Sequence, residues 1–202
     1  MLENELFLNV ALLLTCYAYV LFMIFLSGRV TRFFGLSLKS SRKFLHMMIG
    51  NLPFLIPLFS LNSFPLNFPF FVAAPFILLT FLVSPYSHIL RLNEKLKGLS
   101  GITEEGHPFA LVYYAISYTL LALFFSKTPY VIAAGILPMA YGDSLASLIG
   151  ERFGRRRYHV FAEKSLEGSL AMLVVSFLSL EFSLLFFSTL YSLPLLIKSL
   201  MA

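Results

Sequence analysis

The chain has 202 residues, of which 58% are hydrophobic and 12% are charged, and its formal net charge is +5. Soluble domains usually carry about 25% charged residues. The composition therefore excludes an ordinary soluble domain and predicts an all-α integral membrane protein, with a single transmembrane domain over residues 1–202. Nucleic-acid binding is not expected, because the basic residues lie in loops beside apolar segments.

Six segments are apolar enough to cross a bilayer, which needs about 20 apolar residues per helix. We expect these spans at residues 6–27, 44–61, 66–85, 109–126, 130–150 and 168–191. Acidic rather than basic residues precede the first segment, so we expect a spanning helix there and no cleaved signal peptide. Prolines should kink the second and third spans, since each removes a backbone hydrogen bond: Pro53, Pro57, Pro69 and Pro75.

The basic residues are distributed unevenly between the loops. Thirteen of the fifteen Lys and Arg residues fall in loops 28–43, 86–108 and 151–167. Because positive charge is enriched in cytoplasmic loops, we expect these three loops in the cytoplasm and both termini on the opposite side. We predict a multi-pass protein of the cell membrane or the endoplasmic reticulum. Glu181 falls within the last span, where we expect a buried polar contact with another helix.

A first polar cluster opens the second span. Arg42, Lys43 and His46 are spaced so that they can share one face of a helix. The N-terminus of a helix favours anions, Arg binds phosphate in a bidentate manner and Lys supplies a point charge. These residues form either a phosphate site or an ordinary positive anchor at the membrane surface. For Arg29 and Arg32, anchoring is the favoured interpretation.

A second cluster, Glu104 and Glu105, precedes the fourth span. Acidic residues at this position either stabilise the start of the helix through its dipole or hold a hydrated Mg²⁺ ion.

A third cluster begins at Asp143, an acidic residue inside an apolar helix. A carboxylate in a hydrocarbon span is expensive, which makes Asp143 a candidate functional residue. Small residues recur every four positions in this helix at Gly142, Ala146 and Gly150, and this pattern favours close helix packing. The basic loop that follows can hold phosphate. The segment therefore predicts a phosphate site at a membrane surface, although it has no soluble phosphate-loop or kinase motif.

The spacing in this segment resembles the CTP-dependent polyprenol kinase family, which includes dolichol kinases, phytol kinases and CTP-dependent diacylglycerol kinases. Their signature is D-x-x-A-x-x-x-G-x-x-x-G, then eight residues, then K-K-T-x-E-G. The chain matches it with Asp143, Ala146, Gly150, Gly154 and the segment E-K-S-L-E-G at 163–168. Glu163 and Ser165 depart from the signature. The R-K-F-L-H segment at 42–46 is similar to the family's upstream R-K-x-x-H motif.

The resemblance implies a lipid kinase that moves the γ-phosphoryl group of CTP to the hydroxyl of an isoprenoid alcohol, such as a dolichol, phytol or geranylgeraniol. It implies catalytic roles for Asp143, His46 and Glu167, and Mg²⁺ ligation by Asp143, Glu167 and Glu105. It also implies these CTP-binding residues: Arg42, Lys43, Gly150, Gly154, Arg155, Lys164, Ser165 and Gly168. The alternatives are transfer of CMP to a lipid phosphate, as by a phosphatidate cytidylyltransferase, a diacylglycerol kinase, or a small membrane transporter.

Overall fold

A computed structural model describes residues 2–34, 38–83, 110–159 and 163–200 of the chain. Within these ranges the protein is mostly helical, as the composition predicts. The second predicted cluster, Glu104 and Glu105, lies outside the described residues.

The described part of the chain contains these helical elements in order. They are α1 (Leu2–Phe34), α2 (Leu38–Ile49), the 3-10 helix η1 (Leu52–Leu58), α3 (Phe68–Val83), α6 (Ala110–Phe125), α7 (Pro129–Leu137), the π-helical turn η2 (Pro138–Gly142), α8 (Asp143–Phe153) and α9 (Leu166–Leu200). The all-α prediction misses two short antiparallel hairpins. One pairs β1 (Asn62–Ser63) with β2 (Leu66–Asn67), and the other pairs β3 (Arg157–His159) with β4 (Glu163–Ser165).

Three helical segments are long and apolar enough to cross a membrane, judged by length and composition: Leu2–Ser27, Pro129–Phe153 and Leu166–Leu190. Shorter apolar helices cover Lys43–Leu58, Phe68–Leu82 and Leu111–Phe125. These segments coincide in chain order with the six predicted spans. The number of crossings and the side of the termini stay predictions.

Prolines explain why the second predicted span is not one α-helix. The α-helical part ends at Ile49, and the chain continues as η1, which has Pro53 in its first turn and Pro57 inside. In contrast, α3 remains helical through Pro75, and Pro69 lies in its first turn. A first-turn proline is tolerated because the N–H that it lacks has no partner there in any helix.

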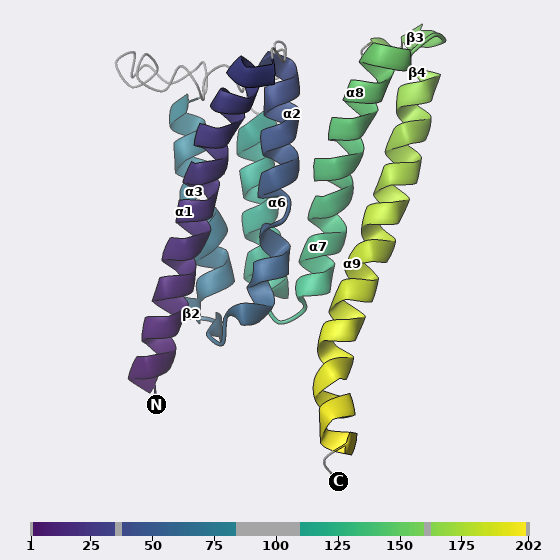
Figure 1. The fold of residues 1–202 in the computed structure, drawn as a ribbon. Helices are drawn as coiled ribbons and strands as arrows, with labels where there is room; N and C mark the ends of the chain where they lie inside the picture. The colour runs from purple at the N-terminus through teal and green to yellow at the C-terminus, as the bar shows by residue number, and fades with distance from the viewer. Residues whose placement is uncertain (1, 35–37, 84–109, 160–162, 201–202) are drawn as a thin grey trace.

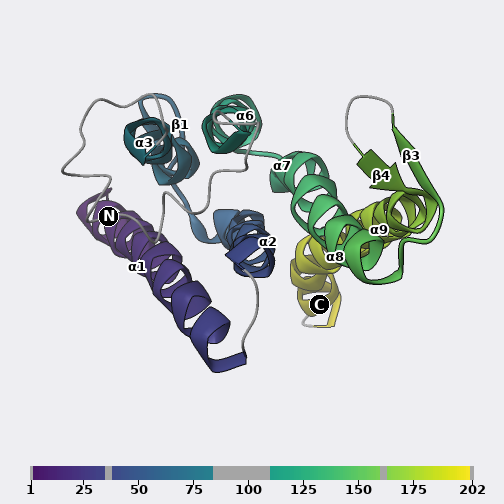
Figure 2. The ribbon, with the colours of Figure 1, turned by 90° about the horizontal axis from the view of Figure 1, so that it is seen from above.

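The helices form two groups with α2 between them. Viewed from above, α1, α3 and α6 lie on one side of α2, and α7, α8 and α9 lie on the other (Figure 2). The start of α1 and the end of α9 lie at the end of the bundle opposite the β3–β4 hairpin (Figure 1). The main buried cluster joins the first group to η1 and α7 through residues such as Val20, Ile56, Phe68, Tyr118 and Ile132.

Two polar residues inside the predicted spans behave differently. Asn9 of α1 is fully buried, and its amide nitrogen donates to the Glu5 carbonyl and to Ser60 Oγ, both at 2.7 Å. Such pairing is required where water is absent. Glu181 is exposed on the surface of α9. The prediction that Glu181 makes a buried contact is therefore wrong, because α9 turns this side chain away from its neighbours.

Candidate functional site

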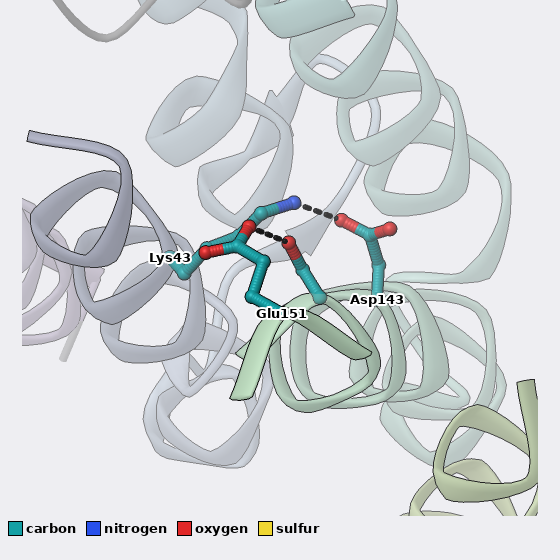
Figure 3. A network of polar contacts seen from close by, with 4 residues as sticks. Lys43, Asp143 and Glu151 are labelled. Carbon is teal, nitrogen blue, oxygen red and sulfur yellow. Dashed lines mark hydrogen bonds and ion pairs between the residues drawn. The ribbon is translucent and has the colours of Figure 1, made fainter. Parts of the chain in front are cut away.

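An ion pair joins the first and third polar clusters. Lys43 of α2 reaches across to α8, and its Nζ lies 2.6 Å from Oδ2 of Asp143 (Figure 3). The Lys43 side chain is 12% exposed and the Asp143 side chain 43% exposed. Removal from water strengthens the attraction between the charges and makes an unpaired lysine here unfavourable. The structure thus brings together two of the residues that the sequence singles out.

The backbone before Asp143 directs its side chain toward α2. The π-helical turn η2 separates α7 from α8 and ends at Gly142, one residue before Asp143. Such turns shift the phase of a helix and are frequent at functional sites. Gly142 packs against α9, where an added Cβ would collide with Ser176 Oγ. This contact explains why the residue beside the carboxylate is small.

Asp143 begins a row of polar side chains on α8 that sequence analysis did not recognise as a unit. Ser147 and Glu151 follow at four-residue intervals, and Ser147 Oγ donates to Glu151 Oε1 at 3.2 Å (Figure 3). Residues four apart share a helix face. The four-residue spacing of Asp143, Ser147 and Glu151 in the sequence could have predicted this row. Glu151 adds a second carboxylate to this face of α8.

His46 lies one turn after Lys43 on α2 but contacts a different helix. Its ring centroid is 4.5 Å from that of Tyr114 in α6. The α2 helix therefore directs Lys43 to α8 and His46 to α6. Arg42 belongs to the same helix, but its side chain lies outside the described part of the chain.

The glycines of the third cluster lie where α8 crosses the start of α9. A Cβ added to Gly150 would lie 2.9 Å from Ser165 Oγ, and one added to Gly168 would lie 2.9 Å from the Ala146 carbonyl oxygen. The predicted close helix packing is thus confirmed. A Cβ on Gly154 would meet the Gly150 carbonyl oxygen and Ser165. The contribution of these residues to nucleotide binding stays a prediction.

Ser165 caps α9. It precedes the first residue of the helix, and its Oγ accepts a hydrogen bond from the backbone N–H of Gly168 at 3.1 Å. This bond satisfies one of the free N–H groups at the start of the helix. The side chain is buried among the glycines of the crossing. Nucleotide binding by Ser165 is untested, but the hydroxyl that it shares with threonine has a structural use.

A basic cleft lies beyond the end of α8. Arg152, Phe153, Gly154, Arg155 and Glu167 line it, and about 760 Å³ of its space is free of protein atoms. Both carboxylate oxygens of Glu167 lie 3.4 Å from the Arg156 backbone nitrogen, which donates to them. Glu167 therefore holds the basic loop against α9. Two guanidinium groups beside a carboxylate suit a phosphate ester that carries a cation.

The β3–β4 hairpin presents the other predicted residues of the basic loop. Lys164 is exposed and pairs across the hairpin with Tyr158. Glu163, which stands where the family signature has lysine, forms an ion pair with Arg157 at 3.0 Å. Both side chains are largely exposed, so this pair contributes little to stability.

The predicted magnesium ligands come from different elements, and their joint ligation of Mg²⁺ stays a prediction. Asp143 begins α8, and Glu167 lies in the first turn of α9, where its carboxylate accepts from the Arg156 backbone nitrogen. Among the described residues, no group of three His, Cys, Asp or Glu side chains is placed to hold a metal ion. Mg²⁺ is often bound by one or two carboxylates together with substrate phosphates. Asp143 and Glu167 each fit that donor set separately.

Comparison with known proteins places these features in context. The chain is 48% identical over 75 residues to the phytol kinase of Synechocystis sp., a match that covers 36% of this chain and 32% of the relative. It is 35% identical over 145 residues to probable phytol kinase 1 of Glycine max, covering 68% of this chain and 46% of the relative.

The chain is also 33% identical over 156 residues to the dolichol kinase of Saccharomyces cerevisiae, covering 71% of this chain and 27% of the relative. The chain thus spans less than half of the length of each of these three relatives. No family model matches it, and no solved structure matches it.

Proposed function

The chain belongs to the polyprenol kinase family, and on this basis we propose that it phosphorylates the hydroxyl group of an isoprenoid alcohol within a membrane, with CTP as the donor. The observation that carries the proposal is the 2.6 Å ion pair between Lys43 and Asp143. It joins the two segments whose motifs resemble those of the family, and it links a shorter apolar helix, Lys43–Leu58, to a helical segment that is long and apolar enough to cross a bilayer, Pro129–Phe153.

The reaction needs alignment and charge neutralisation more than covalent help from the protein. The alcohol oxygen attacks the γ-phosphorus of CTP, the bond to the bridging oxygen breaks, and CDP leaves. The proton of the alcohol passes to a base, either Asp143, which pairs with Lys43, or His46, which lies one turn after Lys43 on α2. Lys43 is placed to neutralise charge on the transferred group.

The basic cleft supports binding of the nucleotide. Arg152 and Arg155 supply positive charge there, and Lys164 is exposed on the neighbouring hairpin. Bound Mg²⁺ would neutralise phosphate charge, held through Glu167 or Asp143 together with phosphate oxygens. Because the basic hairpin lies at one end of the bundle, we place the nucleotide site on the cytoplasmic side of a multi-pass protein (Figure 1).

The test is a paired label-transfer assay on the full chain reconstituted in lipid with Mg²⁺. One sample receives CTP labelled at the γ-phosphate and the other receives CTP labelled at the α-phosphate, each with phytol, a polyprenol, diacylglycerol and phosphatidic acid. We expect label in phytyl or polyprenyl phosphate from the γ position alone. Label from the α position would indicate a cytidylyltransferase, label in phosphatidic acid a diacylglycerol kinase, and label in no lipid would refute the enzyme.

A further inference from the structure

A cavity lies on the side of α2 opposite α8. It is bounded by α2 and by α1, α3 and α6, which lie on one side of α2 in the view from above (Figure 2). The space free of protein atoms at this site is about 650 Å³ when the open space at its mouth is included. Apolar side chains make up most of its wall, among them Val20, Ile49, Val72 and Ala115. We call it the α2–α6 cavity.

The polar groups of this cavity are few. His46 lines it beside Tyr114, and Tyr118 lines it one turn further along α6. The tyrosine side chains are 7% and 4% exposed, and their hydroxyls have no hydrogen-bond partner within the described part of the chain. Buried hydroxyls without partners are unfavourable and uncommon in folded proteins. Two of them at one apolar cavity indicate an occupant that brings a hydrogen-bonding group.

We propose that the α2–α6 cavity binds the acceptor of the phosphoryl group, with the hydroxyl of an isoprenoid alcohol at His46 and Tyr114 and its hydrocarbon tail along the apolar wall. This inference rests on the proposed kinase function. A molecule with one polar atom and an apolar body matches a wall with a few polar groups near His46 and hydrocarbon elsewhere. A single-chain alcohol, with one hydroxyl and one hydrocarbon tail, fits this wall of few polar groups and much hydrocarbon better than a lipid with a glycerol headgroup.

The position of His46 connects the cavity to the ion pair. His46 and Lys43 are three residues apart on α2, a rise of about 4.5 Å, and they contact α6 and α8 respectively. A hydroxyl held at His46 therefore lies within about one helical turn of the level at which Lys43 meets Asp143. The α2 helix therefore carries one contact residue for the acceptor and one for the phosphoryl group, on neighbouring positions of its surface.

The first test is a substitution on α6 that fills the cavity with a larger side chain. Ala115 is buried in the cavity wall, so the variant is Ala115→Phe. The matched control is Ala18→Phe, because Ala18 is exposed on α1. We expect Ala115→Phe to raise the KM for phytol by about tenfold or more, because the added ring displaces the tail. The KM for CTP should stay within about twofold of the starting value, since the nucleotide does not enter the cavity.

A second measurement avoids dependence on one variant. A phytol analogue with a photoreactive diazirine on its tail is crosslinked to the unmodified protein, and the labelled residues are mapped by mass spectrometry. We expect label on α3 and α6, with protection by excess phytol. If Ala115→Phe does not fold, Ala73→Leu fills the same cavity from α3.

The outcomes separate this inference from the proposed function. Absence of γ-phosphoryl transfer to any alcohol by the unmodified protein would overturn the kinase itself, and with it the acceptor site. An active protein whose KM for phytol is unchanged by Ala115→Phe, or whose label falls on α8 and α9, would overturn the cavity alone. Protection by diacylglycerol but not by phytol would overturn the assignment of an isoprenoid alcohol.

Discussion

Lys43 and Asp143 are 100 residues apart in the chain, and their side chains meet at 2.6 Å. The lysine is the more buried partner, so water reaches its ammonium group less and the carboxylate of Asp143 compensates most of its positive charge. A phosphate group brought to this position competes for the same ammonium group. The pair is therefore suited to exchange one anionic partner for another during a reaction.

The first prediction concerns the carboxylate. Asp143→Asn keeps the size of the side chain but removes its charge, so we expect kcat to fall by about 100-fold or more with a folded protein. The measurement is γ-phosphoryl transfer from CTP to phytol. Glu181→Gln is the matched control, because Glu181 is exposed on α9, away from the ion pair. Near-full activity of Asp143→Asn would remove Asp143 from the site.

The second prediction tests whether Lys43 and Asp143 each act on the reactants or only neutralise each other. If Asp143 served only to neutralise Lys43, the double variant with Lys43→Met and Asp143→Asn would recover the activity lost by Asp143→Asn alone. We expect no recovery, because the carboxylate and the ammonium group each act on the reactants. A double-mutant cycle on kcat measures the coupling. Recovery to within about threefold of the unmodified activity would assign a structural role to the pair.

The third prediction concerns the helix crossing. In Gly150→Ala the new Cβ would lie 2.9 Å from Ser165 Oγ and 3.5 Å from the Gly168 Cα, so we expect destabilisation of about 1–3 kcal/mol. Gly135→Ala in α7 is the control, because its Cβ would meet only the flexible end of Leu121. Thermal unfolding in detergent measures both. Equal melting temperatures would show that the crossing adjusts freely.

The fourth prediction concerns charge beside the basic cleft. Glu163→Lys removes the exposed ion pair with Arg157 and restores the lysine of the family signature. We expect stability to change by less than about 1 kcal/mol, because the pair is solvated. The KM for CTP should fall severalfold at low salt, and the difference should shrink as ionic strength rises. A KM that is insensitive to both changes would place the nucleotide away from the hairpin.

The sequence was sufficient to predict the apolar segments, because hydropathy and length are local properties that any surrounding structure must accommodate. It also predicted the small-residue packing around Gly150, since a four-residue repeat defines one helix face. The departure at the second span follows from Pro53 and Pro57, whose missing N–H groups favour a break over a kink.

Other features depended on packing between distant segments. The tertiary structure decided that Lys43 pairs with Asp143, that Glu151 joins the same polar row and that Glu181 faces outward. It also placed Asp143 at the start of α8 and Glu167 in the first turn of α9, where its carboxylate accepts from the backbone of the basic loop. Helical spacing determines which residues share a face, but the phase set by η2 and the crossing of α8 with α9 determine what each face contacts.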